Sequence, residues 1–207
     1  MVAEQLRARG IKDTAVLNAM RQIPREHFVP TVYLEHAYRD GPIPLPARQT
    51  ISQPYVVAYM LAALSLQSTD RVLEVGTGSG YAAAILSQIV QDVYTIERHK
   101  SLVTYARERL HDLACDNVHI LVGDGSLGWA EQAPFDAIIV AAGGPHVPPA
   151  LQQQLAVNGR LIMPVGRRKG QRLVIVRREG PDTFIRESLV TVRFVPLVGQ
   201  DAWEKGD

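Results

Sequence analysis

Residues 71–97 read RVLEVGTGSGYAAAILSQIVQDVYTIE, and this stretch decides the fold. It divides into an apolar run of strand length at 71–75, a helical pattern at 80–90 and a second strand-length run at 92–97. Continuous apolar strands joined through a helix are typical of a parallel sheet that is covered on both faces. We therefore predict one strand–helix–strand unit of a doubly wound α/β domain.

The same alternation continues on the C-terminal side of this unit. Helical patterns and strand-length runs follow at 100–113 (helix), 118–124 (strand), 135–142 (strand), 148–156 (helix) and 159–166 (strand). After these, the runs 172–179 and 188–198 are strand-like, and Gly180-Pro181 forms a turn between them. The sequence thus predicts a mostly parallel sheet that ends in an antiparallel hairpin.

The N-terminal side has two short helical patterns, at 2–9 and 14–23. Gly10 suits the end of the first helix, and Asp13 or Thr14 suits the cap of the second. Several prolines then favour a loop with short extended pieces. This region is expected to form a helical cap beside the sheet.

A further helix is expected at 53–64. Ser52 stands where an N-cap would lie, and Pro54 falls in the first turn, where a proline is tolerated. The same serine is also a candidate for chemistry, as argued below.

Composition and charge exclude several classes of protein. The chain has 207 residues and a net charge of +1, so neither a nucleic-acid-binding face nor a membrane surface is expected. No apolar run approaches the ~18 residues that span a bilayer, and residues 1–10 lack the apolar core of a signal peptide. The single cysteine, Cys115, favours the reducing cytoplasm, where we expect a monomer.

No metal site is expected either. None of the six histidines belongs to an H-x-x-x-H or H-E-x-x-H pattern, and no cluster with cysteine or glutamate has metal-ligand spacing. Cys115 ends a helical pattern, so a packing role is expected for it.

The turn after the first strand reads EVGTGSGY (74–81). Glycines at such a turn let backbone N–H groups approach a ligand closely. A dinucleotide fingerprint needs a small residue where Tyr81 stands, which disfavours a nicotinamide dehydrogenase. A glycine-rich turn without a ligand is the alternative, but the position at the switch point of an open sheet favours a bound nucleotide-like group.

Two acidic residues follow the second and third strands. Glu97 lies about 20 positions after Gly76, where a carboxylate is placed to bind ribose hydroxyls. Paired with the glycine turn, this interpretation is favoured over a solvated charge at the strand end. Asp124 precedes Gly125, so a simple turn aspartate remains a competitive interpretation there.

The G-x-G-x-G spacing resembles that of S-adenosylmethionine-dependent methyltransferases, which have a Rossmann-like sheet. In that resemblance Glu74 faces the methionine part of the cofactor, and Asp124 accepts a hydrogen bond from the adenine amino group. Amide and base N-methyltransferases place an Asn-Pro-Pro-aromatic run after the fourth strand. This chain has AAGGPH (141–146) there instead.

The segment TISQP (50–54) narrows the resemblance. Together with the glycine turn, Asp124-Gly125, FDAI (135–138) and NGRL (158–161), it closely resembles the protein-L-isoaspartate O-methyltransferase family. The match runs from VAEQLRARGI (2–11) and IPREHFVP (23–30) to FVPL (194–197). The TISQP segment is far more specific than the glycine turn, which marks only the superfamily.

That family methylates the free α-carboxylate of L-isoaspartyl residues in damaged proteins and leaves S-adenosyl-L-homocysteine. The ester collapses to a succinimide, and hydrolysis restores some aspartate. The resemblance implies one methyltransferase domain over 1–207, with isoaspartyl-containing proteins and peptides as partners. Its parts are an N-terminal helical cap with a substrate loop (1–68), a cofactor-binding core (69–166) and a closing hairpin with a tail (167–207).

The resemblance also implies site residues. Ser52 is the active-site serine. The cofactor-binding residues are Thr50, Ile51, Glu74, Gly76, Thr77, Gly78, Ser79, Gly80, Tyr81, Glu97, Arg98, Asp124 and Gly125. The substrate-binding residues are Arg48, Thr50, Ile51, Ser52, Ala141 and Ala142, and residues 141–145 with the final strand help enclose the isoaspartyl backbone.

One segment departs from the family pattern. Bacterial members commonly have Gly-His-Gly just before Gln49, where this chain has Pro46, Ala47 and Arg48. A guanidinium can engage a carboxylate with two hydrogen bonds. Arg48 is therefore a candidate to bind the substrate carboxylate or an acidic neighbour, and an exposed loop arginine is the equal alternative.

The chemistry needs no strong base, because a carboxylate with a pKa of about 4 is already ionised at neutral pH. Positioning should then supply most of the rate, up to roughly 7–11 kcal/mol. Ser52 can bind one carboxylate oxygen and aim the other, or it can serve only as a helix cap worth about 1 kcal/mol. A small-molecule carboxyl or O-methyltransferase and a non-catalytic S-adenosylmethionine-binding protein remain the rival functions.

Overall fold

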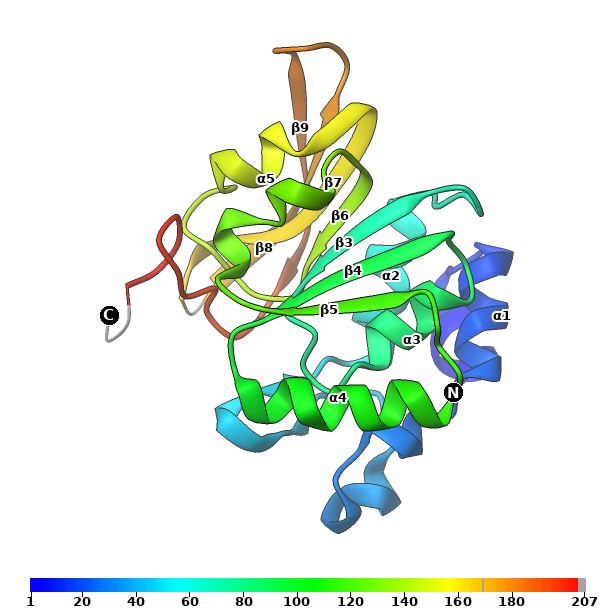
Figure 1. The fold of residues 1–207 in the computed structure, drawn as a ribbon. Coiled ribbons are helices and arrows are strands. Elements are labelled where there is room, and N and C mark those ends of the chain that lie inside the picture. The colour runs from blue at the N-terminus through cyan, green and yellow to red at the C-terminus, as the bar shows by residue number, and fades with distance from the viewer. Residues whose placement is uncertain (169, 205–207) are drawn as a thin grey trace.

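The computed structural model describes residues 1–168 and 170–204, with a seven-stranded sheet at the centre (Figure 1). In spatial order the strands are β5 (Val118–Val122), β4 (Asp92–Glu97), β3 (Arg71–Val75), β6 (Phe135–Val140), β7 (Leu155–Arg167), β8 (Gly170–Arg178) and β9 (Phe184–Val192). The strands from β5 to β7 are parallel, and β8 and β9 add an antiparallel hairpin. The predicted doubly wound α/β fold is confirmed.

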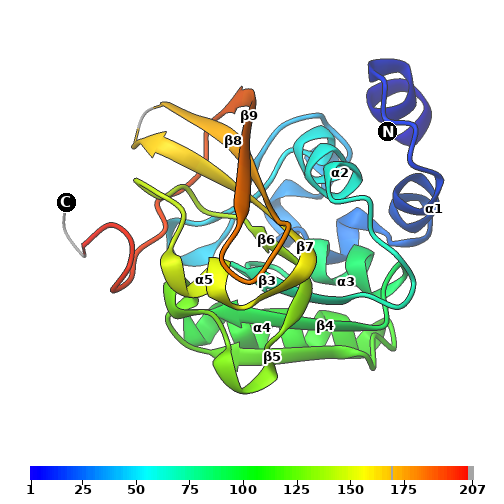
Figure 2. The same ribbon diagram turned by 90° about the horizontal axis from the view of Figure 1, so that it is seen from above.

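Helices cover both faces of the sheet (Figures 1 and 2). On one face lie α2 (Pro54–Ala63), α3 (Tyr81–Ser87) and α4 (Lys100–Asp112), and on the other lies α5 (Pro149–Gln153). Neighbouring residues of β3 enter different cores, because Val72 packs beneath α2 to α4 whereas Leu73 packs beneath α5. Alternation across a strand that is buried on both sides explains the continuous apolar runs in the sequence.

The N-terminal segment packs beside α2 and α3. In chain order it holds a π-helical turn (Val2–Leu6), a 3₁₀ turn (Arg7–Arg9), α1 (Thr14–Gln22), 3₁₀ turns (Arg25–Phe28 and Thr31–His36), β1 (Ile43–Pro44), a 3₁₀ turn (Pro46–Arg48) and β2 (Thr50–Ile51). The single helix expected at 2–9 is therefore wrong, although Gly10 does end this region with a φ of 93°. Asp13 caps α1 by accepting a hydrogen bond from the Val16 N–H at 3.0 Å.

The last strand lies earlier in the chain than the predicted 188–198. Val192 pairs with Gln171, next to the first residue of β8, so pairing between β8 and β9 stops there. Residues 193–198 run instead along the loop after β6, where Gly143 donates to the Val195 carbonyl and accepts from the Leu197 N–H, both at 2.8 Å. This segment thereby becomes part of the pocket described below.

The predicted cap of α2 is also wrong. The N-cap is Gln53, not Ser52, and its own side chain makes no capping bond. Asp40 supplies the missing acceptor, because its Oδ1 accepts from the Tyr55 N–H at 3.3 Å and its Oδ2 accepts from Gln53 Nε2 at 2.7 Å. The Ser52 hydroxyl is therefore not committed to holding the helix.

Candidate active site

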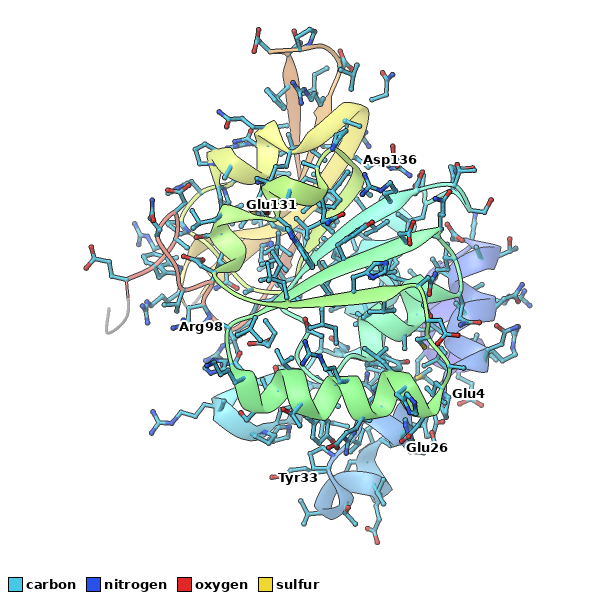
Figure 3. The ribbon with its side chains drawn as sticks, viewed as in Figure 1. Glu4, Glu26, Tyr33, Arg98, Glu131 and Asp136 are labelled. Atoms are coloured by element: carbon cyan, nitrogen blue, oxygen red, sulfur yellow. The ribbon has the colours of Figure 1, made fainter. Side chains whose placement is uncertain are left out.

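A pocket opens where β3, β4 and β6 end, at the place where the strand order reverses between β3 and β6. Ligands of open α/β sheets bind in this crevice. Figure 3 shows Arg98 beside this end of the sheet and Asp136 near the opposite end. The lining comprises residues 49–52, 74–79, 96–99, 141–142 and 194–198 with Val57, Met60, Tyr81, Ala82, Gly125 and Ile139.

The turn after β3 brings the backbone up to this pocket. Gly76 and Gly80 have φ values of 99° and 90°, which favour glycine. A Cβ on Gly76 would lie 3.4 Å from the Cβ of Ala141, and one on Gly80 would lie 3.3 Å from Ala106 and Leu110 of α4. Gly76 therefore permits the close approach of the loop after β6, and Gly80 permits the packing of α4.

Glu97 fastens this turn to the end of β4. Its buried carboxylate accepts from the Gly78 N–H at 3.1 Å and from the His99 N–H at 2.9 Å, one on each oxygen. A carboxylate oxygen has two lone pairs, so both oxygens can still accept a hydrogen bond from a ligand. Since Glu97 lines the pocket, its predicted role toward ribose hydroxyls is sterically open.

Glu74 lies deeper and is almost completely buried. The Thr95 hydroxyl donates to Glu74 Oε2 at 2.5 Å and lies 2.6 Å from the Thr77 hydroxyl. Burial raises the pKa of Glu74 to about 8; the Thr95 hydrogen bond lowers it and the neighbouring Glu97 charge adds to the rise. The pocket therefore holds a carboxyl group that is mostly protonated at neutral pH unless a cation joins it.

The opposite wall is the segment from Thr50 to Ser52. β2 pairs with β1, which places Ile51 opposite Ile43 and leaves Ile51 buried. Ala47 and Arg48 before it have φ values of 56° and 57°, an unfavourable region for residues other than glycine.

The Protein-L-isoaspartate(D-aspartate) O-methyltransferase family matches residues 1–202. The chain belongs to this family. A Pelobacter propionicus protein-L-isoaspartate O-methyltransferase 2 is 57% identical over 98% of this chain and 91% of the relative. A Brucella anthropi protein-L-isoaspartate O-methyltransferase is 52% identical over 98% of this chain and 94% of the relative.

Solved structures of the family have the same fold. A protein-L-isoaspartate O-methyltransferase aligns with a TM-score of 0.85 and 28% identity over 98% of this chain and 67% of the other. A Plasmodium falciparum protein-L-isoaspartate O-methyltransferase, in complex with S-adenosyl-L-homocysteine, aligns with a TM-score of 0.83 and 29% identity over 95% and 96% of the two chains.

Most residues that the family resemblance implied lie together in the pocket. Those in its lining are Thr50, Ile51, Ser52, Glu74, Gly76, Thr77, Gly78, Ser79, Tyr81, Glu97, Arg98, Gly125, Ala141 and Ala142. Three lie outside the lining: Arg48, Gly80 and Asp124. Arg48 is exposed beside Gln49, and Gly80 faces α4.

Asp124 is bound to the C-terminal segment. Its carboxylate accepts from the Ser126 N–H at 2.9 Å and from the Gln200 N–H at 2.8 Å. A Cβ on Gly199 would collide with Asp124 Oδ1, so the two segments are in close contact. Oδ2 keeps acceptor capacity, but Asp124 lies outside the pocket lining, so the predicted bond from the adenine amino group stays a prediction.

Sequence reasoning missed parts of the pocket that long-range contacts create. Residues 194–198 enter the lining because they leave the hairpin, and Arg98 Nη1 donates to the Val198 carbonyl at 3.4 Å. Val57 and Met60 of α2 face the site as well. In the sequence, only the FVPL run (194–197) indicated that residues 194–198 belong to the site.

Over the described ranges 1–168 and 170–204, no group of three or more histidine, cysteine, aspartate or glutamate side chains is arranged to hold a metal ion. Within the same ranges, no helix is long and apolar enough to cross a membrane. Cys115 is buried and free.

Proposed function

We propose that this chain transfers the methyl group of S-adenosylmethionine to the free α-carboxylate of L-isoaspartyl residues in proteins and peptides, which begins their repair. One observation carries the proposal. The glycine turn and the Thr50–Ser52 segment, which belong to distant parts of the chain, are two walls of one pocket. The membership of the family and the names of the relatives agree with it.

The residues present fit S-adenosylmethionine. The positive φ at Gly76 brings the turn close to Ala141, and the backbone around it can face a ligand. Glu97 keeps free acceptor capacity for ribose hydroxyls, and Glu74 offers a buried carboxyl group for the cationic methionine part. When bound, this cofactor supplies a sulfonium methyl group, which the substrate carboxylate takes as the carbon–sulfur bond breaks toward sulfur, leaving a methyl ester and S-adenosyl-L-homocysteine.

The chain's own residues contribute by positioning. The substrate carboxylate is ionised at neutral pH, so no side chain has to remove a proton. The Ser52 hydroxyl, which does not cap α2, donates to one carboxylate oxygen and thereby aims the other. Thr50 and Ile51 on one side and Ala141 and Ala142 on the other confine the substrate backbone between them.

Confinement explains a preference for isoaspartate. Its free carboxylate is attached directly to Cα, whereas the carboxylate of aspartate lies one methylene farther from the backbone. A displacement of about 1 Å can cost on the order of a hundredfold in rate. We therefore expect methylation of L-isoaspartyl peptides and very little methylation of matched L-aspartyl peptides.

The test uses labelled S-adenosylmethionine with paired isoaspartyl and aspartyl peptides of one sequence. Turnover of the isoaspartyl peptide alone supports the proposal. Equal turnover of both, or turnover of small carboxylic acids alone, would indicate a broader carboxyl methyltransferase. Binding of the cofactor without any turnover would indicate a non-catalytic binding protein.

The finer expectations belong to the proposal as well. Arg48 is exposed beside Gln49, and we propose that it binds an acidic residue next to the isoaspartyl group. Arg48→Ala would then raise the KM for peptides with acidic flanks only. A cytoplasmic monomer is expected, which cell fractionation and size-exclusion chromatography test.

A further inference from the structure

Arg25 is completely buried, with 0% exposure. It begins the 3₁₀ turn Arg25–Phe28, outside the pocket lining. Its Nε donates to the Ala37 carbonyl at 2.8 Å, and its Nη2 donates to the Ser52 carbonyl at 2.9 Å. One guanidinium thus joins the N-terminal segment to the backbone of the proposed active-site serine.

The charge of Arg25 has no close counter-ion. Within residues 1–168 and 170–204 no carboxylate lies within ion-pair distance of it, and its Nη1 has no hydrogen-bond partner. Burial lowers the pKa of the guanidinium, while Tyr81 and the more distant Asp40 oppose this shift. Burying an unpaired charge opposes folding, so a purely structural role is a poor explanation for this arginine.

Arg25 also contacts the pocket through Tyr81. The guanidinium carbon lies 4.8 Å from the centre of the Tyr81 ring, and Tyr81 lines the pocket. The same ring packs on Phe28 at a centroid distance of 5.6 Å. Tyr81 thus has a second aromatic contact besides Arg25, whereas the hydrogen bond from Arg25 Nη2 ties the guanidinium directly to the Ser52 backbone.

We propose that Arg25 is a positioning residue of the methyl-transfer reaction, which fixes the Ser52 backbone so that the Ser52 hydroxyl aims the substrate carboxylate. The proposal rests on the proposed function. It assigns Arg25 no contact with the substrate or the reacting atoms. The residue acts through Ser52, so its effect should disappear when the Ser52 hydroxyl is absent.

The test is a double-mutant cycle in kcat, because coupling between two residues appears as non-additivity. It uses the full chain with Arg25→Met, Arg25→Lys, Ser52→Ala and both combinations, assayed on an isoaspartyl peptide. We expect Arg25→Met to lower kcat roughly 30- to 100-fold, near the penalty for a misplaced nucleophile. Arg25→Lys should lower kcat less, about 5-fold, because an ammonium can still donate to the Ser52 carbonyl.

In the Ser52→Ala background both Arg25 substitutions should change kcat less than about 3-fold. The dissociation constant for S-adenosyl-L-homocysteine should change by less than about 3-fold in every variant, which a general distortion of the fold would not allow. Arg160→Lys is the matched control, because Arg160 also donates to backbone carbonyls, of Leu64 and Ser65, but lies outside the pocket. Its kcat should stay at the wild-type value.

Two results would overturn the assignment: equal losses in both Ser52 backgrounds, or a loss of cofactor affinity as large as the loss of kcat. If Arg25→Met does not fold, the Arg25→Lys half of the cycle decides by the same criteria. Absence of isoaspartyl turnover in the wild-type chain would instead refute the proposed function, so the two failures are distinguishable.

Discussion

The two ends of α2 are each held by an arginine that donates to backbone carbonyls, but the two arginines differ in whether a carboxylate partner compensates their charge. At the carboxyl end, Arg160 donates to the Leu64 carbonyl and to the Ser65 carbonyl, and it forms a 2.6 Å ion pair with Asp70. At the amino end, Arg25 donates to the Ser52 carbonyl, and no carboxylate of residues 1–168 or 170–204 forms an ion pair with it.

This difference in charge compensation suggests different roles for the two arginines, a structural role for Arg160 and the proposed positioning role for Arg25. A buried arginine that has a carboxylate partner can hold two segments without leaving a charge uncompensated. An unpaired one lowers stability, which agrees with the functional role proposed for Arg25. The pocket lies at the end of α2 with the unpaired arginine, so each end can be tested with its own substitution.

The largest expected effect is on stability, at the carboxyl end. Arg160→Met leaves the mostly buried Asp70 carboxylate without its partner, which costs about 3–5 kcal/mol in comparable buried pairs. Denaturant unfolding should show this loss as a lower midpoint. The fraction that remains folded at low temperature should keep the wild-type kcat. A lower kcat per folded molecule in Arg160→Met would show that the carboxyl end of α2 also affects catalysis, which contradicts the proposed difference between the two ends.

The next effect concerns cofactor affinity at the pocket end. Glu97→Ala removes a charged acceptor proposed for the ribose hydroxyls, and hydrogen bonds to charged groups contribute about 1.5–3 kcal/mol. S-adenosylmethionine binding should weaken roughly 10- to 100-fold by calorimetry. Glu97→Gln, which retains one acceptor oxygen, is the matched control and should lose less. Unchanged affinity in Glu97→Ala would remove this residue from the site.

Glu74 should lower the stability of the fold at high pH while it favours cofactor binding. Its pKa is about 8 in the folded state, above the ordinary value of 4.5, so the folded chain binds more protons than the unfolded chain between these values. Stability therefore falls as the pH rises from about 4.5 to about 8 and then levels off. Glu74→Gln should remove this slope and raise the free energy of unfolding at pH 8 by about 2 kcal/mol, within the limit set by the shift.

The same substitution should weaken cofactor binding, because an amide cannot become an anion beside the cationic methionine part. Thermal melting at several pH values measures the first effect, and calorimetry measures the second. A Glu74→Gln protein that is less stable than the wild type at pH 8 would contradict the assigned cost of burial.

Local sequence patterns were enough to predict the parallel sheet and the glycine turn that lines one wall of the pocket. Residues 71–97 carry their own strand, turn and helix signals, and Glu97 meets the turn simply because β3 and β4 are neighbours. Arg25 and Asp40 gave no such signal. Their partners, Ser52 and Tyr55, lie 27 and 15 positions away, and only the packed N-terminal segment brings them together.

Strand ends and caps were mispredicted for a related reason. The apolar run 188–198 looks like one strand, but β9 can extend only as far as β8 offers partners. Ser52 looks like a helix cap because its residue type suits one, but tertiary structure gave the role to Asp40. The proposed role of Ser52 in the chemistry therefore rests on the family resemblance of the TISQP segment and not on a local pattern.

The smallest expected effect compares two helix caps. Asp13 caps α1, outside the pocket, and Asp40 caps α2 next to Ser52, where it also accepts from Gln53 Nε2. Asp13→Ala should cost about 1 kcal/mol of stability, the usual value for a lost cap, and Asp40→Ala somewhat more because Asp40 also pairs with Arg9. Asp40→Ala should in addition lower kcat several-fold, because Gln53 follows Ser52 in the chain and its side chain loses its anchor. Asp13→Ala should leave kcat unchanged.

Equal kcat values for the two variants, measured with saturating isoaspartyl peptide and cofactor, would show that the amino end of α2 tolerates movement. The requirement for fixed geometry would then rest on Arg25 alone.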